Sequence, residues 1–304
     1  MSSGLSDRAA AALAGDDVVE LVDVGCDLAD VDRHAEALVC FERAVALGDA
    51  LSWFNVGNTL RDLDRAEEAV DAYEHAVAAG EPAAWLNLGI VLEFLGDHAG
   101  AERAYTGAWE GAGQAVGCLN LAHLLDEQDR RPEAEAWLAQ AVARGSGRDP
   151  SDAEVAALLA RWRWERTRDP ALEEDLRTGS AVDGDTRAAF AELLLSTGRR
   201  TQARAELELG AKLGHTACWL PLGNLLCGDD LDDRSGAVRD EVDEVAAEEA
   251  YRAGIAAGDL HCHHNLAMLL LEQGRDAEAE EHLRTGAAGG DALAREVLRD
   301  LRDE

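Results

Sequence analysis

The chain repeats its own pattern at an interval of 32 residues. Seven positions between residues 50 and 111 carry matching residues in two consecutive copies. The first copy contains Trp53, Val56, Gly57, Leu60, Ala69, Tyr73 and Ala76, and the second contains Trp85, Leu88, Gly89, Leu92, Ala101, Tyr105 and Ala108. A repeat of this length indicates stacked supersecondary units that bury their apolar faces against one another.

The composition favours helices as the building elements. Ala, Leu, Glu, Arg and Asp dominate, aromatic residues make up 5%, and runs of β-branched residues are nearly absent. A length of 304 residues is no obstacle, because a repeat array grows without needing a larger core. The sequence therefore predicts an all-α chain of helical hairpins.

The repeated signature resembles the tetratricopeptide repeat. That family places a Trp and a Leu-Gly pair on a first helix, and Ala, an aromatic residue and Ala on a second helix. Several hairpins also end in a small or apolar residue, Gly and an acid, which is similar to the related Sel1-like repeats; examples are residues 46–49, 79–81, 257–259 and 289–291. The resemblance implies a right-handed α-solenoid superhelix of about seven to eight helix-turn-helix repeats that binds other proteins.

The pattern divides the chain into five expected segments. They are a capping helix at 1–17, four regular repeats at 18–147, a degenerate repeat with a loop at 148–183, three repeats at 184–291, and a closing capping helix at 292–304. Helices of the degenerate repeat are expected near 153–168 and 171–179. An acidic insertion at 228–242 interrupts one repeat, and we expect a solvated loop there, because Leu231 and Val242 would stand where a calcium loop needs carboxylates.

The charge balance is strongly acidic. The chain has 28 basic and 61 acidic residues, a formal net charge of -33. Such a field repels phosphate groups, so we expect no nucleic-acid or membrane partner, and it would steer a basic protein or peptide to the surface. The alternative is that the acidity only keeps the chain soluble and monomeric.

Other sequence signals favour a cytoplasmic, non-catalytic protein. The start of the chain lacks a basic stretch followed by an apolar one, and no apolar run approaches the roughly 18 residues of a membrane span. Six scattered cysteines are typical of buried thiols in a reducing compartment. Neither a phosphate-binding glycine loop nor a nucleophile elbow is present, so we expect no cofactor and no catalytic residue.

Asparagines recur at one place in the repeats. Asn55, Asn87, Asn120 and Asn265 each immediately precede the Leu-Gly pair or its equivalent. In the family that the chain resembles, this position lines the concave groove, and in some members an asparagine ladder holds an extended peptide. A carboxamide suits this task because it offers both a donor and an acceptor. The alternative is that Asn is merely common at this place in the family.

Neighbouring positions extend or interrupt this ladder. Asn58 and Asn224 stand three residues later in their repeats, and Arg61 is the one basic groove candidate. Ala189 and Pro221 occupy the asparagine position in two later repeats and leave a gap. The basic residues with which some family members hold a C-terminal carboxylate are also missing, so recognition of a chain terminus is not expected.

A basic and aromatic cluster stands out in the acidic chain. It comprises Arg161, Trp162, Arg163 and Trp164. Arg and Trp are enriched at binding hot spots, which suggests a docking or self-association patch, with Trp162 or Trp164 at the interface. The two tryptophans lie about 200° apart on a helix, so at most one is expected to point inward. The alternatives are one core Trp with arginines that neutralise nearby acids, and a nucleic-acid contact, which the net charge disfavours.

Residues 261–264 form a run of histidines and a cysteine. His261 and His264 share a helix face and could ligate zinc, whereas Cys262 and His263 match packing positions. The preferred hypothesis is a non-catalytic scaffold that binds an extended or helical, basic segment of a partner in its concave groove. Two alternatives stay open: a self-assembling structural component, and a metal-binding accessory subunit of an enzyme. The oligomeric state is not determined by these patterns.

Overall fold

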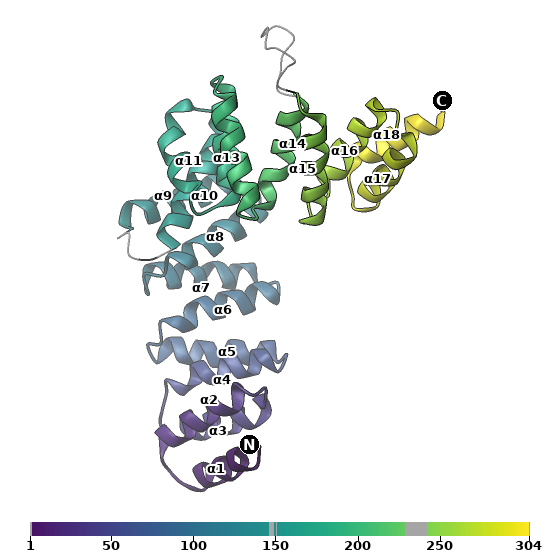
Figure 1. Cartoon of the computed structure of the whole chain (residues 1–304). Helices are drawn as coiled ribbons and strands as arrows, with labels where there is room; N and C mark the ends of the chain where they lie inside the picture. Colours follow the sequence, from purple (N-terminus) through teal and green to yellow (C-terminus); the bar gives the residue numbers. More distant parts are fainter. Residues whose placement is uncertain (1, 146–148, 150, 229–241, 304) are drawn as a thin grey trace. The chain divides into compact units, whose positions relative to one another are not determined.

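The computed structural model describes residues 2–145, 149, 151–228 and 242–303, and every regular element within them is a helix (Figure 1). The all-α prediction is therefore confirmed. The inner part of the acidic insertion expected at 228–242 lies outside the described residues.

The α-helices are α1 (Ser2–Ala14), α2 (Val18–Ala29), α3 (His34–Ala46), α4 (Ser52–Asp62), α5 (Ala66–Ala78), α6 (Ala83–Phe94), α7 (His98–Glu110), α8 (Ala115–Glu127), α9 (Arg131–Arg144), α10 (Ser151–Thr167), α11 (Glu173–Gly179), α12 (Gly184–Ser196), α13 (Arg200–Lys212), α14 (Trp219–Cys227), α15 (Glu244–Ala256), α16 (His261–Glu272), α17 (Asp276–Ala288) and α18 (Ala292–Asp303), with short 3-10 helices η1 (Pro170–Leu172) and η2 (Thr216–Cys218).

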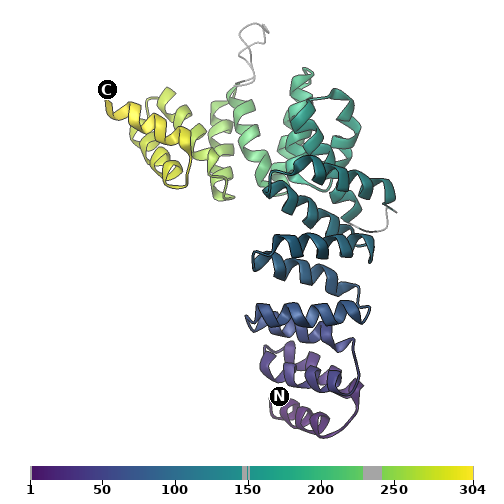
Figure 2. The same cartoon turned by 180° about the vertical axis from the view of Figure 1, so that it is seen from behind.

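The chain forms two compact units, residues 1–155 and residues 156–304. In the first unit α1 packs on α2 and α3, and the hairpins α2/α3, α4/α5, α6/α7 and α8/α9 follow one another. The second helix of each hairpin also contacts the first helix of the next, as Figure 2 shows from behind. This unit is a stack of helical hairpins, as the repeat predicted.

The second unit begins within α10 and is also built of stacked hairpins. Helix α11 packs on α12, the hairpins α12/α13, α14/α15 and α16/α17 follow, and α18 packs on α17. One continuous core runs through the unit, from Trp164 and Leu176 to Leu283 and Ala294. Each hairpin thus buries its apolar side against its neighbours, which is the energetic basis of a repeat stack.

A glycine and an aromatic ring hold the two helices of several hairpins together. A Cβ atom added to Gly25 or Gly57 would lie 2.6 Å from the ring of Phe41 or Tyr73, sixteen residues later. Only Gly lets the first helix approach the ring so closely. Where the first helix carries Ala in place of Gly, the second helix carries the slimmer Leu, as in the pairs Ala122/Leu138, Ala191/Leu207 and Ala267/Leu283.

The turn inside each hairpin of the first unit requires a left-handed backbone. Asp64 adopts φ 58° there, and Gly96 adopts φ 79° one repeat later. Asp tolerates this conformation because its short polar side chain bonds locally, and Gly has no Cβ to clash. Gly80, which follows the second helix α5, also adopts this conformation, with φ 89°. The interval of the repeat is thus set by turn chemistry as well as by packing.

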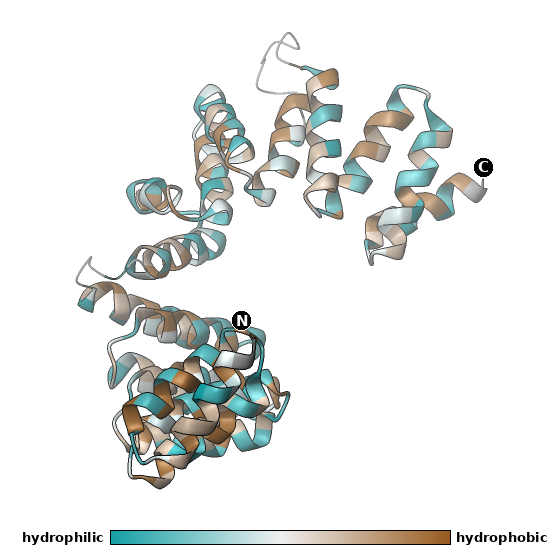
Figure 3. Cartoon of the chain, turned by 60° about the horizontal axis from the view of Figure 1, so that its bottom comes forward, coloured by the Kyte–Doolittle hydropathy of each residue, from teal (hydrophilic) through white to brown (hydrophobic). Residues whose placement is uncertain are grey.

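Hydrophobic and hydrophilic residues alternate within the helices, and none of them is hydrophobic throughout (Figure 3). No helix in the described part of the chain combines the length and apolar character needed to span a bilayer. All six cysteines are free thiols, and four of them are buried. Burial raises the pKa of Cys118 and Cys262 to about 12, so these thiols stay protonated and act as packing groups.

Candidate functional site

All six asparagines of the chain lie on the first helices of hairpins. All six are half-buried. First helices that touch are α4 with α6 in the first unit and α14 with α16 in the second. The surface that the first helices form within each unit is here called the first-helix face of that unit. In the first unit it carries Asn55 and Asn58 on α4, Asn87 on α6 and Asn120 on α8, and in the second unit Asn224 on α14 and Asn265 on α16.

Two of these asparagines and a tyrosine form a hydrogen-bonded cluster in the first unit. The Tyr73 hydroxyl donates to Asn58 Oδ1 over 2.8 Å, and Asn87 Nδ2 donates to the same oxygen over 2.8 Å. Burial raises the pKa of Tyr73 to about 12, so its hydroxyl stays protonated and available as the donor. The cluster bridges two consecutive repeats, and we call it an asparagine bridge.

The second unit contains the same asparagine bridge. Here the Tyr251 hydroxyl donates to Asn224 Oδ1 over 2.8 Å, and Asn265 Nδ2 donates to that oxygen over 2.6 Å. Asn224 follows Gly223 as Asn58 follows Gly57. The geometry recurs because the same three residue types occupy equivalent repeat positions.

Asn55 and Asn120 lack a complete bridge. The repeat before Asn55 carries Phe41 and Cys26 in place of the tyrosine and the asparagine. Within the described part of the chain, the side chain of Asn55 has no hydrogen-bond partner, and only its backbone carbonyl accepts a bond, from Thr59. Beside Asn120, the Tyr105 hydroxyl donates to Glu93 Oε2 over 2.6 Å and also interacts with the Asn120 side chain. Asn55 is therefore the asparagine that is least engaged within the fold, and Asn120 is held without a second asparagine.

Arg61 lies at the exposed edge of α4 and is engaged with its neighbour. Its Nη2 lies 3.0 Å from Oδ1 of Asp62. Most other guanidinium groups are also paired, often with carboxylates of the preceding repeat. Examples are Arg33 with Glu36, Arg65 with Glu68, Arg130 with Glu102 and Glu133, and Arg275 with Glu248 and Glu278. The excess of acidic charge is thus left at the surface.

Two asparagines line hollows on the first-helix face. The Phe94 hollow in the first unit, of about 460 Å³, is lined by Ile90, Glu93, Phe94, Tyr105, Asn120 and His123. The His264 hollow in the second unit, of about 210 Å³, is lined by Cys227, Glu244, Tyr251, His264, Asn265, Met268, Leu269 and Glu272. In both, an asparagine carboxamide stands beside the tyrosine of the preceding repeat.

The apolar part of the Phe94 hollow was not anticipated from the sequence. Phe94 is 80% exposed and Ile90 42% exposed, although both are large and apolar. Exposed apolar side chains beside polar ones are typical of interaction surfaces. The signal was present in the spacing, because Ile90 and Phe94 follow Asn87 by three and seven residues and share its side of α6.

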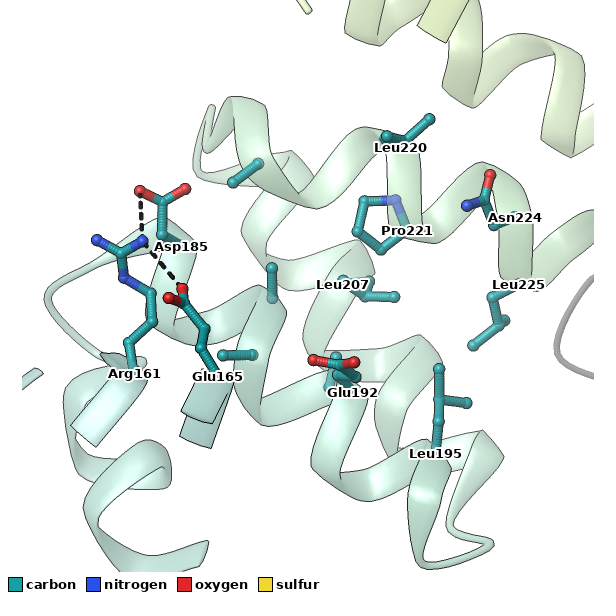
Figure 4. A pocket seen from close by; sticks show the side chains of 14 residues that line it. Arg161, Glu165, Asp185, Glu192, Leu195, Leu207, Leu220, Pro221, Asn224 and Leu225 are labelled. Atoms are coloured by element: carbon teal, nitrogen blue, oxygen red, sulfur yellow. Dashed lines mark hydrogen bonds and ion pairs between the residues drawn. The ribbon is translucent and has the colours of Figure 1, made fainter. Parts of the chain in front are cut away.

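A third hollow, the Ala189 hollow, lies within the second unit and has a volume of about 550 Å³ (Figure 4). Its lining comes from α10, α12, α13, α14 and the turn before α14. The residues are Arg161, Glu165, Asp185, Ala188, Ala189, Ala191, Glu192, Leu195, Leu207, Ala217, Leu220, Pro221, Asn224 and Leu225. Ala189 and Pro221 were expected only as a gap in the asparagine ladder, and the hollow was not predicted from the sequence.

The expected orientation of the two tryptophans on α10 is wrong. Trp162 is 2% exposed and Trp164 is 1% exposed, so both point inward. The four consecutive residues from Ala157 to Ala160 are also buried, which requires that α10 be covered on more than one side. Trp164 Nε1 donates to Glu192 Oε2 over 2.9 Å. Neither ring is therefore available to a docking patch of the kind that the sequence suggested. The side chains of Arg161 and Arg163 are half-buried.

The histidine run does not converge on a metal site. His261 is 76% exposed, whereas His263 is buried and its Nδ1 lies 3.0 Å from Nδ1 of His282 on α17. Burial lowers the pKa of both His263 and His282. Nowhere in the described ranges do three or more His, Cys, Asp or Glu residues gather as metal ligands would. The geometry thus gives the metal alternative no support.

The architecture defines the class: a helical-repeat protein that carries its asparagines on the first helices of its hairpins. Profiles of the tetratricopeptide repeat match residues 50–79, 82–105, 118–145 and 260–285. These segments are tetratricopeptide repeats, and the resemblance seen in the sequence is confirmed. No curated protein sequence matches the chain.

Solved structures share the fold. The antigen c5321 of uropathogenic Escherichia coli, which displays a Sel1-like repeat fold, is 19% identical with a TM-score of 0.62, covering 98% of this chain and 66% of its own. Cut9 in the Cut9-Hcn1 complex is 15% identical with a TM-score of 0.54, covering 97% and 55%. Human IFIT1, solved as a dimer with PPP-AAAA, is 15% identical with a TM-score of 0.53, covering 95% and 73%.

These likenesses establish a fold with features of both repeat families. The chain spans just under two thirds of c5321 and about half of Cut9. Repeats of these families generally mediate interactions between proteins and typically form non-catalytic scaffolds.

Proposed function

We propose that this protein is a non-catalytic scaffold that binds an extended or helical, basic segment of a partner protein on its first-helix face. The observation that carries the proposal is the placement of every asparagine of the chain on that face, in both units. Asparagine occurs nowhere else in the sequence. If asparagines served only to make the surface polar, they would be expected on the second helices as well.

The contacts suggest how a segment would be held. In the asparagine bridges, Nδ2 of Asn87 and of Asn265 is engaged within the protein, so Oδ1 is left to accept from a partner N–H. Asn55, with no side-chain partner in the described structure, offers both a donor and an acceptor. The Phe94 and His264 hollows stand beside this strip of amides and suit apolar side chains of the same segment.

The basic character of the partner follows from charge. The net charge is -33, and the guanidinium groups that could oppose it are largely held in ion pairs within and between repeats. A segment rich in Lys or Arg would be steered to such a surface, and its binding would weaken as salt rises.

The test compares variants in capture of partners from native extract. The double variant Asn55→Ala/Asn120→Ala removes two carboxamides that make few contacts in the fold. The control Gln202→Ala removes an exposed amide from α13, a second helix. We expect a basic protein, released at moderate salt, to be retained by the wild type and the control and depleted at least tenfold on the double variant. Equal capture by a folded double variant would remove the asparagines from the proposal.

The self-assembly alternative loses the surface assigned to it, because Trp162 and Trp164 are buried. Sedimentation of the full chain over a range of concentrations addresses it directly. A mass that rises with concentration would support assembly, and a constant monomer mass would oppose it.

A further inference from the structure

We propose that the Ala189 hollow is a specificity pocket that takes one large apolar side chain, Phe or Leu, with a Lys or Arg next to it in the bound segment. This inference rests on the proposed function and adds what kind of sequence the second unit selects.

The hollow coincides with the gap in the asparagine ladder. Ala189 and Pro221 occupy the positions that carry Asn87 and Asn120 in the first unit. Ala188 on α12 stands where other first helices carry Phe54, Leu86 and Leu119. Because Ala188 and Ala189 have shorter side chains than the residues at these positions in other repeats, the first-helix face is recessed where the ladder is interrupted.

The walls of the recess are apolar. Leu195, Leu207, Leu220 and Leu225 converge on it from three helices, and Figure 4 shows Leu195, Leu207 and Leu225 grouped around the space below Pro221. A volume of about 550 Å³ is within the range of pockets that bind small organic groups. It exceeds the space filled by one aromatic side chain, so the occupant can enter without displacing the leucines. Full burial of such a side chain strengthens binding on the order of 10- to 100-fold.

Carboxylates dominate the rim. Arg161 lies 3.5 Å from Glu165 and 3.8 Å from Asp185, and these three side chains stand together at one side of the hollow (Figure 4). Glu192 accepts from Trp164 Nε1 and pairs with the exposed Arg168, which follows the end of α10 and lies outside the lining. The lining thus contains three carboxylate side chains and one guanidinium group. A cation on the incoming segment would be attracted to this acidic rim.

The hollow is continuous with the asparagine bridge of the second unit. Asn224 lines it, and Oδ1 of Asn224 already accepts from Tyr251 and Asn265. This leaves Nδ2 of Asn224 to donate to a backbone carbonyl of the segment. A peptide whose apolar side chain fills the hollow would therefore be held by its backbone at Asn224 and Asn265.

The test uses synthetic peptides as probes. Fluorescein-labelled twelve-residue peptides built from Gly and Ser carry a central Arg-Phe, Arg-Ala, Ser-Phe or Glu-Phe pair, and their binding to the full chain is measured by fluorescence anisotropy. We expect the Arg-Phe peptide to bind at least tenfold more tightly than the other three. Equal affinities, or no binding of the Arg-Phe peptide at millimolar protein, would overturn the pocket.

Variants locate the effect. Ala188→Phe places a ring in the hollow from a half-buried position, and Ala181→Phe adds the same ring at an exposed position outside the lining. The first should abolish the preference for Arg-Phe, and the second should preserve it. Retention of the preference in a folded Ala188→Phe protein would overturn the assignment.

A second measurement does not depend on folding of the variants. In wild-type protein with 13C-labelled alanine methyls, the Arg-Phe peptide should shift the signals of Ala188, Ala189 and Ala217. Shifts confined to other alanines would place the peptide elsewhere and overturn the pocket. If partner capture remains sensitive to Asn55 and Asn120 while the peptides show no preference, only the pocket fails. If capture is insensitive as well, the proposed function fails with it.

Discussion

Nδ2 of Asn87 donates to Oδ1 of Asn58 across the boundary between two repeats, over 2.8 Å. The bond fixes the orientation of the Asn87 carboxamide, because its nitrogen is engaged within the protein and its oxygen is left at the surface. A group held in one orientation loses less conformational entropy when a ligand binds. The asparagine bridge thus connects repeat packing with the proposed binding face.

The Tyr73 hydroxyl should support both stability and binding through this bridge. Tyr73→Phe removes the hydrogen bond to Asn58 while it keeps the ring against Gly57. We expect the free energy of unfolding to fall by about 1 kcal/mol. Partner affinity should fall as well, since Asn58 no longer has both donors to orient it. Urea denaturation and a binding titration measure the two effects, and Tyr251→Phe should repeat them in the second unit. A variant with unchanged affinity would show that the bridge is purely structural.

The glycine and the aromatic ring of each pair should be energetically coupled. Gly25→Ala brings a methyl group to 2.6 Å from the ring of Phe41, so we expect a loss of about 1–3 kcal/mol in stability. The additional change Phe41→Leu should recover much of that loss, because the pair Ala122/Leu138 occurs naturally in this chain. A double-mutant cycle by chemical denaturation measures the coupling, and strictly additive effects would contradict it.

The buried ion pair between α12 and α13 should contribute more to stability than an exposed ion pair. The side chain of Arg187 is 6% exposed, and its guanidinium donates to Glu206 and to the carbonyl oxygen of Ser180. Glu206→Ala leaves the Arg187 charge without its carboxylate, and we expect the free energy of unfolding to fall by about 2–3 kcal/mol. The loss is smaller than for a fully buried pair because Glu206 is partly exposed. Glu208→Ala on the same helix breaks an exposed pair and should cost less than about 1 kcal/mol. Similar losses in the two variants would argue against the pairing.

Acid should weaken the last repeats through the contact between His263 and His282. Burial lowers the pKa of both imidazoles; the nearby Arg252 lowers that of His282 further, and Glu278 and Glu281 partly oppose it. Both groups are neutral in the folded and unfolded states above the ordinary value of about 6.5. As pH falls below this value the unfolded state takes up protons first, so stability falls with pH.

Denaturation midpoints between pH 5 and pH 8 measure this effect. The double variant His263→Gln/His282→Gln should flatten the decline over this range. An equal decline in the double variant would assign the effect to other groups.

The helical architecture could be predicted from the sequence for a physical reason. Each hairpin is made from about one period of chain, and the residues that pack it, such as Gly57 and Tyr73, are only sixteen positions apart. The left-handed turn at Asp64 and the helix end at Gly80 are likewise local. Local spacing determines which face of each helix is apolar, and it correctly placed the asparagines on first helices. The right-handed sense of the superhelix stays a prediction.

Only the tertiary structure decided what surrounds each face. The periodicity of α10 indicated one buried side, yet both Trp162 and Trp164 are buried, because coverage of a helix depends on neighbours that its own sequence does not describe. Ala189 and Pro221 read as missing ladder positions, and the volume that they leave open depends on the summed size of side chains from several helices. The sequence by itself determined the hairpins and their polar positions. The pairing of Asn58 with Asn87 and the hollow at Ala189 required the packed repeats, since contacts and cavities arise between elements.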